Sequence, residues 1–191
     1  MNFFQVWLKG YLKPHEAFAG LKDKPLWWGL SGVLICWGLR DIFYVLPMLL
    51  SGAKPFVPSY LNFLSDANYY KAEIYFMPLM GLVEWLATSS LIYVLLRLFK
   101  GIKDFDAILN YGGMAAVIVA PPCLVMDWIL IAFGLRILPV MAVTHSVIVV
   151  WSVILGAIAF KRLFNLKYSF SAAIIAISLL VGVLIGALFS R

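Results

Sequence analysis

The sequence predicts an all-α protein: a polytopic transmembrane helix bundle of five spans, preceded by an N-terminal interfacial amphipathic helix. Hydrophobic residues make up 64% of the chain and charged residues 13%, whereas soluble domains are about half apolar and a quarter charged. Five apolar runs each have the ~20 residues that a helix needs to cross a bilayer. In none of the runs do apolar and polar residues alternate, as they do in the strands of a membrane β-barrel. We therefore expect almost the whole chain to lie in or against a bilayer.

Two parts are expected, a cytoplasmic amphipathic segment over residues 1–25 and a five-helix transmembrane domain over residues 26–191. The N-terminus is apolar first and basic second, the reverse of a cleavable signal peptide. Continuous hydrophobicity places the spans at 26–50, 73–99, 107–133, 137–160 and 170–189.

The first residues predict a helix that lies in the cytoplasmic interface. Aromatic and leucine side chains recur there at helical spacing, and lysines lie on the other side. Such a helix buries its aromatic face at the headgroup boundary while its lysines meet anionic lipid. The residues expected to anchor it are Phe3, Phe4, Trp7, Leu8, Lys9, Tyr11 and Lys13. Packing of the same helix as a lid on the bundle is the equally open alternative.

Lysine and arginine in the connections predict the orientation. The basic residues before span one and after spans two and four are Lys9, Lys13, Lys22, Lys24, Arg97, Lys100, Lys103, Lys161, Arg162 and Lys167. The other side has only Lys54, Lys71, Arg136 and Arg191. Positive charge stays in the cytoplasm, so we expect a cytoplasmic N-terminus and an outside C-terminus, in the plasma or inner membrane if the chain is prokaryotic. The net charge of +6 is too scattered to indicate nucleic-acid binding.

Ionisable residues inside predicted spans are costly, and each is therefore a candidate functional residue. They are Arg40, Asp41, Glu84, Asp127 and His145. With the predicted orientation all five fall in the outer half of the bilayer. If the three carboxylates ionise, they exceed the one arginine by about two negative charges, which a low-dielectric interior does not tolerate without compensation.

Two interpretations of this buried polar cluster remain open. In the structural one, Arg40 bridges carboxylates of neighbouring helices and His145 bonds to a backbone carbonyl. In the functional one, a proton, a cation or a water pocket balances the charge, and the cluster belongs to an ion-coupled transporter or channel.

Span three contains a predicted helix break at Pro121 and Pro122, because proline lacks the donor of the helical hydrogen bond and clashes with the preceding turn. The freed carbonyls either meet an ion, as in transporters with broken helices, or accompany a simple packing kink. Span five carries a helix-packing face of small residues, Ser178, Gly182 and Gly186. The partner of that face is another helix of the chain or a second copy, so a homo-oligomer is one prediction.

Enzyme signatures such as GxSxG, a Walker loop, HExxH or CxxC are absent from the sequence. We therefore predict neither enzymatic activity nor a cofactor. The two histidines, His15 and His145, lie in separate regions, so no histidine-based metal site is expected. Cys36 and Cys123 both lie within apolar runs and predict no disulfide framework.

Two segments carry a resemblance to a known family. They are KPHEAFAGLKDKP, Lys13 to Pro25, and FDAILNYGGMAAVIVAPPCLV, Phe105 to Val125. Together they resemble the Yip domain family, named for Ypt/Rab-interacting membrane proteins, and especially its prokaryotic branch. The resemblance implies five spans with the N-terminus in the cytoplasm and the C-terminus outside. The DLYGP-type motif and the longer cytosolic segment of eukaryotic members are missing.

The function expected first, from the resemblance, is that of a non-enzymatic scaffold or adaptor in membrane organisation, trafficking or envelope maintenance. Its contacts would be the lipid bilayer, a second copy through the last span and a protein partner on the cytoplasmic side. The alternative function is the transporter or channel built on the buried polar cluster.

Overall fold

The computed structural model describes residues 1–55 and 65–189, with side chains described as far as residue 186. The α-helices of the described residues are α1 (Phe3–Leu12), α2 (Pro14–Ala19), α3 (Trp27–Arg40), α4 (Leu46–Leu50), α5 (Tyr69–Lys100), α6 (Phe105–Ala132), α7 (Leu138–Phe164) and α8 (Tyr168–Phe189). A π-helical turn, η1 (Asp41–Val45), joins α3 to α4, and a 3₁₀ turn, η2 (Asp66–Asn68), precedes α5.

Five helical stretches are long and apolar enough to cross a membrane, which confirms the predicted fold class and makes the chain a multi-pass membrane protein. They are Trp27–Leu50, Asp66–Lys100, Phe105–Ala132, Leu138–Phe164 and Tyr168–Gly186. The second begins earlier than predicted. Tyr70 is buried there and accepts a 3.0 Å hydrogen bond from Arg136, so the start of α5 packs into the bundle.

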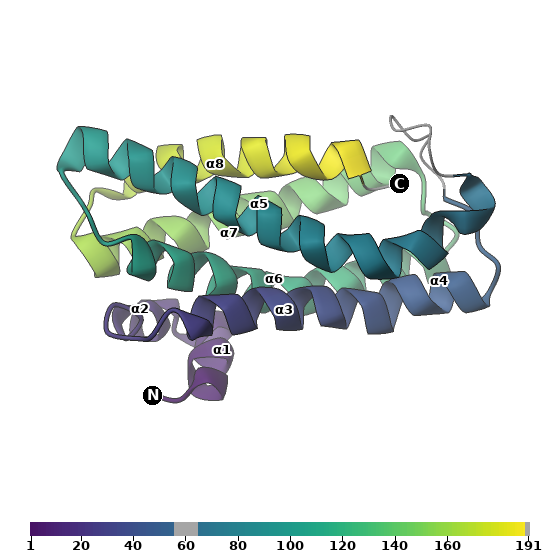
Figure 1. The fold of residues 1–191 in the computed structure, drawn as a ribbon, viewed down its shortest axis with the longest axis horizontal. Coiled ribbons are helices and arrows are strands. Elements are labelled where there is room, and N and C mark those ends of the chain that lie inside the picture. Colours follow the sequence, from purple (N-terminus) through teal and green to yellow (C-terminus); the bar gives the residue numbers. More distant parts are fainter. Residues whose placement is uncertain (56–64, 190–191) are drawn as a thin grey trace.

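The long helices lie side by side, and their connections gather at two ends (Figure 1). Helix α2 and the connections 101–104 and 165–167 lie at one end, and the connection 133–137 lies at the other. Helix α1 crosses the bundle beside α6 rather than extending it. The connections in which basic residues are most frequent therefore share one end.

Glycines let α3 and α6 approach to backbone contact. A Cβ on Gly113 would lie 1.9 Å from the carbonyl oxygen of Gly29, and one on Gly32 would lie 2.2 Å from that of Gly113. Fully buried Asn110 ties the crossing together, because its Oδ1 accepts from the Gly29 amide at 2.9 Å and its Nδ2 donates to the Lys24 carbonyl at 2.7 Å. The Asn110 side chain thereby provides an acceptor for the backbone N–H of Gly29, in the first turn of α3.

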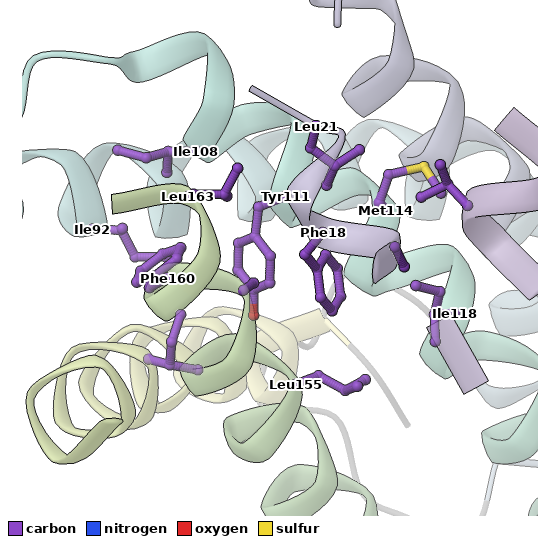
Figure 2. Close-up of a cluster of buried hydrophobic side chains, with 14 of the residues drawn as sticks. Phe18, Leu21, Ile92, Ile108, Tyr111, Met114, Ile118, Leu155, Phe160 and Leu163 are labelled. Carbon is purple, nitrogen blue, oxygen red and sulfur yellow. The ribbon is translucent and has the colours of Figure 1, made fainter. Parts of the chain in front are cut away.

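Three side chains that follow α1, Ala17, Phe18 and Leu21, belong to the main core, although the sequence suggests a separate peripheral segment. Phe18 and Leu21 are fully buried. The Tyr111 ring of α6 lies between Phe18 and Phe160, at centroid distances of 5.8 and 5.0 Å (Figure 2). Helix α2 therefore closes this end of the bundle with the same packing that holds α6 to α7.

Helix α6 continues through Pro121 and Pro122 to Ala132, so the helix is not interrupted at these prolines, and the simple packing kink given as the alternative stays a prediction. Each proline removes the donor that the carbonyl four residues earlier would use, which frees the carbonyls of Val117 and Ile118. Helix α1 supplies replacement donors to both. Trp7 Nε1 lies 3.0 Å from the Val117 oxygen, and the Tyr11 hydroxyl lies 2.6 Å from that of Ile118. The freed carbonyls are thus bonded within the protein rather than offered to an ion.

The predicted anchor residues of α1 divide between two faces. Phe3, Trp7 and Tyr11 pack on the bundle core, as the lid alternative expects. Phe4 and Leu8 are 61% and 47% exposed and remain available to lipid. Lys9 and Lys13 do not extend freely, because both pair with Glu16 of α2, at 2.6 and 3.5 Å. Contact of the exposed face with the bilayer interface stays a prediction.

Candidate functional site

A cavity of about 610 Å³ lies within the bundle, among α3, α5, α6, α7 and α8. Four of the five predicted buried ionisable residues line it: Arg40, Glu84, Asp127 and His145. Its volume falls in the range of small-molecule sites, about 300–1,000 Å³. The structure therefore brings together residues from four helices that are far apart in the sequence.

Asp41 is the predicted member that does not line the cavity. It begins the π-helical turn η1, and its buried Oδ1 has no hydrogen-bond partner among the described residues. Successive helical residues point about 100° apart, and of these two neighbours it is Arg40 that is turned toward the cavity. Asp41 thus lies outside the cavity, and its membership of one buried polar cluster with the other four stays a prediction.

Arg40 forms an ion pair with Glu73, a residue that the sequence analysis did not single out. Arg40 Nη2 lies 3.2 Å from Glu73 Oε1, and the Glu73 side chain is only 1% exposed. The guanidinium also lies over the Trp37 ring, 5.3 Å from its centroid. Glu73 stood at the predicted edge of span two, yet it lies beside Arg40 because α3 and α5 pack together. Arg40 thus bridges to a carboxylate of a neighbouring helix, as the structural interpretation expects.

Glu84 points into the cavity beside the small-residue face of α8. A Cβ on Gly182 would lie 2.9 Å from Glu84 Oε1, so glycine at this position leaves room for the carboxylate. Within the part of the chain that the structure describes, the Glu84 carboxylate has neither an ion pair nor a hydrogen bond. Among the described residues, no positively charged group contacts this carboxylate to offset the cost of burying it.

The helix-packing face of α8 is used inside the chain. Ser178 is 2% exposed, and its hydroxyl donates to the Ile174 carbonyl at 2.9 Å. Ser178, Gly182 and Gly186 all line the cavity, although a Cβ on Gly186 would meet nothing within 4 Å. The close approach predicted for this face occurs between α8 and α5. Self-association through α8 remains a prediction.

A second polar group joins α6 to α7. His145 Nε2 lies 3.3 Å from Asp127 Oδ1, and His145 Nδ1 lies 2.9 Å from the Met141 carbonyl oxygen. The ligand atoms of Cys123, Asp127 and His145 all lie within 4.8 Å of one another. The two histidines lie in separate regions of the sequence, so this cluster around one histidine was not predicted. Cys123 and Asp127 are four residues apart on one helix, which was the available signal.

The charges that line the cavity sum to a negative value. Glu73 neutralises Arg40, and Asp127 is paired with His145, which is cationic only when protonated. Glu84 adds a carboxylate that contacts no positive group among the described residues. An apolar surrounding does not tolerate this charge unless protons or a bound cation balance it. The arrangement suits the binding of a cation better than that of an anion.

Comparison with protein-family models, with curated proteins and with solved structures finds no match. The resemblance to the Yip domain family therefore stays a prediction.

Proposed function

We propose that the protein is a cation-coupled membrane transporter and that the cavity is its binding site. The observation that carries this proposal is the position of Glu84, a carboxylate that faces a 610 Å³ space inside the bundle and contacts no cation among the described residues. A carboxylate in such a place can alternate between a proton and a cation. This exchange is the elementary step of ion-coupled transport.

The orientation proposed for the transporter has the N-terminus in the cytoplasm and the C-terminus outside. It is supported by the basic connections that gather at the α2 end of the bundle. In this orientation the cavity extends from Tyr111, near the cytoplasmic start of α6, to Asp127, near the outer end of that helix. Reporter fusions to the two termini test it, since a reporter active only in the cytoplasm should work at residue 1 and fail at residue 191.

A scaffold or adaptor role, which the Yip-like layout implies, remains the alternative. The two surfaces expected to carry it have partners inside the chain: Trp7 and Tyr11 bond to α6, and Gly182 packs beside Glu84. The exposed side chains Phe4 and Leu8 are still available for lipid or protein contacts. We favour transport because the cavity has no role in the scaffold hypothesis.

Flux measurements in proteoliposomes test the proposal. Purified protein is reconstituted with an internal pH dye, and gradients of Na⁺, K⁺ or Zn²⁺ are imposed in turn. We expect at least one cation gradient to drive proton movement that depends on pH. Glu84→Gln should lower the rate at least tenfold, because the amide retains the shape and cannot exchange a proton.

Gly186→Ala is the matched control for Glu84→Gln. It also alters a residue that lines the cavity, but its added Cβ meets open space, so the flux should be retained. The proposal is refuted if none of these gradients drives flux, or if Glu84→Gln transports at the rate of the unmodified protein.

A further inference from the structure

We infer that Cys123, Asp127 and His145 form a binding site for a soft or borderline divalent transition metal of the Zn²⁺ type. This inference deepens the proposed function, since the three residues line the same cavity and would select its cation. It rests first on geometry: one thiol, one carboxylate oxygen and one imidazole nitrogen lie within 4.8 Å of one another. They come from two helices that pack together, α6 and α7.

The orientation of the His145 ring provides a second observation. The Met141 carbonyl can only accept a hydrogen bond, so the proton on the ring must be at Nδ1, 2.9 Å away. In the neutral ring Nε2 then carries a lone pair, and it faces Asp127 Oδ1 at 3.3 Å. Metal-bound histidines commonly hold their second nitrogen in this way, with a backbone carbonyl as partner. The imidazole is thus prepared to bind through Nε2.

Asp127 provides a third observation. Its Oδ1 is buried and has no hydrogen bond of acceptable geometry in the described part of the chain, although His145 Nε2 is nearby. If Nε2 is unprotonated, two acceptors face each other, which is unfavourable unless a cation lies between them. An ion placed there would satisfy both atoms. It would also bind the Cys123 thiolate and offset the negative charge of the cavity.

The mixture of ligands indicates the class of metal. Mg²⁺ and Ca²⁺ take oxygen ligands, whereas thiolate and imidazole favour Zn²⁺ and its neighbours. Tetrahedral zinc with bonds of about 2.0–2.3 Å separates its ligand atoms by roughly 3.5 Å, so side-chain shifts of about 1 Å would close the site. Three protein ligands leave the fourth position open to the cavity. An open position is typical of sites that exchange a ligand rather than of structural zinc sites.

Metal binding to the purified full-length protein tests the inference independently of transport. Metal-free protein in detergent is titrated with Zn²⁺ by calorimetry and with Co²⁺ by absorption spectroscopy. We expect one ion per chain and a thiolate-to-cobalt charge-transfer band in the near ultraviolet. Cys123→Ser should abolish the band, and Asp127→Asn and His145→Gln should each weaken Zn²⁺ binding at least tenfold. The histidine outside the cavity provides the control, because His15→Gln should leave the band and the affinity unchanged.

A second measurement leaves the three ligand residues unchanged, so its result does not depend on whether the ligand variants fold. In Cys36→Ser, which has Cys123 as its only thiol, Zn²⁺ should slow alkylation of Cys123 at least tenfold, and Mg²⁺ should not. Absence of stoichiometric Zn²⁺ uptake, or uptake that survives both Cys123→Ser and His145→Gln, overturns the inference. Zn²⁺ binding without any cation flux would support the metal site and refute the transporter. Flux of Na⁺ or K⁺ without Zn²⁺ binding would support the transporter and refute the metal site.

Discussion

The indole nitrogen of Trp7 lies 3.0 Å from the carbonyl oxygen of Val117, the group that lost its helical donor to Pro121. The Tyr11 hydroxyl lies 2.6 Å from the carbonyl oxygen of Ile118, which lost its helical donor to Pro122. Tryptophan at position 7 and tyrosine at position 11 are one helical turn apart on α1, and the carbonyls that they bond are adjacent on α6. Helix α1 therefore completes the hydrogen bonding of a transmembrane helix that two prolines would otherwise disrupt.

Trp7→Phe should destabilise the protein by about 1–3 kcal/mol, the cost of leaving a buried acceptor unsatisfied. The cost should shrink in a Pro121→Ala background, because alanine restores the backbone donor for the Val117 carbonyl. A double-mutant cycle of unfolding free energies in mixed micelles measures this coupling. Equal costs of Trp7→Phe in the two backgrounds would show that the indole acts only through packing.

Gly182→Ala should impair flux without strongly destabilising the bundle. Its Cβ would lie 2.9 Å from Glu84 Oε1, and a carboxylate that points into a cavity can move aside. We expect a several-fold fall in transport rate and an unfolding cost below the ~1–3 kcal/mol typical of overpacked cores. Gly186→Ala, measured in the same proteoliposomes, should match the unmodified protein. Equal flux in both alanine variants would show that crowding of the Glu84 carboxylate does not affect transport.

The Arg40–Glu73 pair should stabilise the bundle as a unit. Removing one partner, by Arg40→Met or Glu73→Gln, leaves the other group buried without its partner and should cost about 3–5 kcal/mol. The double variant should recover most of that loss, because no unpaired charge remains. Unfolding free energies of the three variants provide the measurement. Additive costs would mean that the two side chains, 3.2 Å apart, do not stabilise each other.

The contact between α1 and α2 should depend on pH through Glu16. Its pKa is lowered from the ordinary value of 4.5, chiefly by the hydrogen bond from Lys9 and further by the charge of Lys13. Because the folded-state pKa is the lower one, the contact stabilises the protein above pH 4.5 and is lost as the pH falls through the folded value.

Glu16→Gln should therefore be less stable than the unmodified protein at pH 7 and equal to it near pH 3, as judged from unfolding midpoints. Added salt should reduce the difference at pH 7, since both partners are exposed. A Glu16→Gln difference that persists unchanged at pH 3 would point to a cause other than ionisation.

The fold could be predicted because hydropathy and length are properties of local sequence. Five apolar runs were sufficient to place the spans within a few residues. The start of α5 was missed because Tyr69 and Tyr70 are polar enough for an interface, and only their packing in the bundle draws them into a helix. The uninterrupted α6 was missed for a similar reason, since the donors that replace those lost at Pro121 and Pro122 come from residues more than 100 positions away.

The candidate site could be predicted in part. The cost of burying charge was enough to select Arg40, Glu84, Asp127 and His145. The pairing of Arg40 with Glu73 depends on the register of α3 against α5, which no local pattern specifies. The cluster of Cys123 with Asp127 and His145 similarly requires α6 to face α7 at one height. Which helix faces which is a tertiary property, and it decides both the ion pair and the metal ligands.

A water-accessible cavity inside the bilayer is tested most directly by the reactivity of Cys123 in intact proteoliposomes. In Cys36→Ser, a cationic, membrane-impermeant methanethiosulfonate should modify Cys123, and Glu84→Gln should slow the reaction because the cavity loses a negative charge. Reaction of Cys123 with a membrane-permeant maleimide alone, or only after the bilayer is dissolved in detergent, would contradict the proposal that the cavity binds a cation from water.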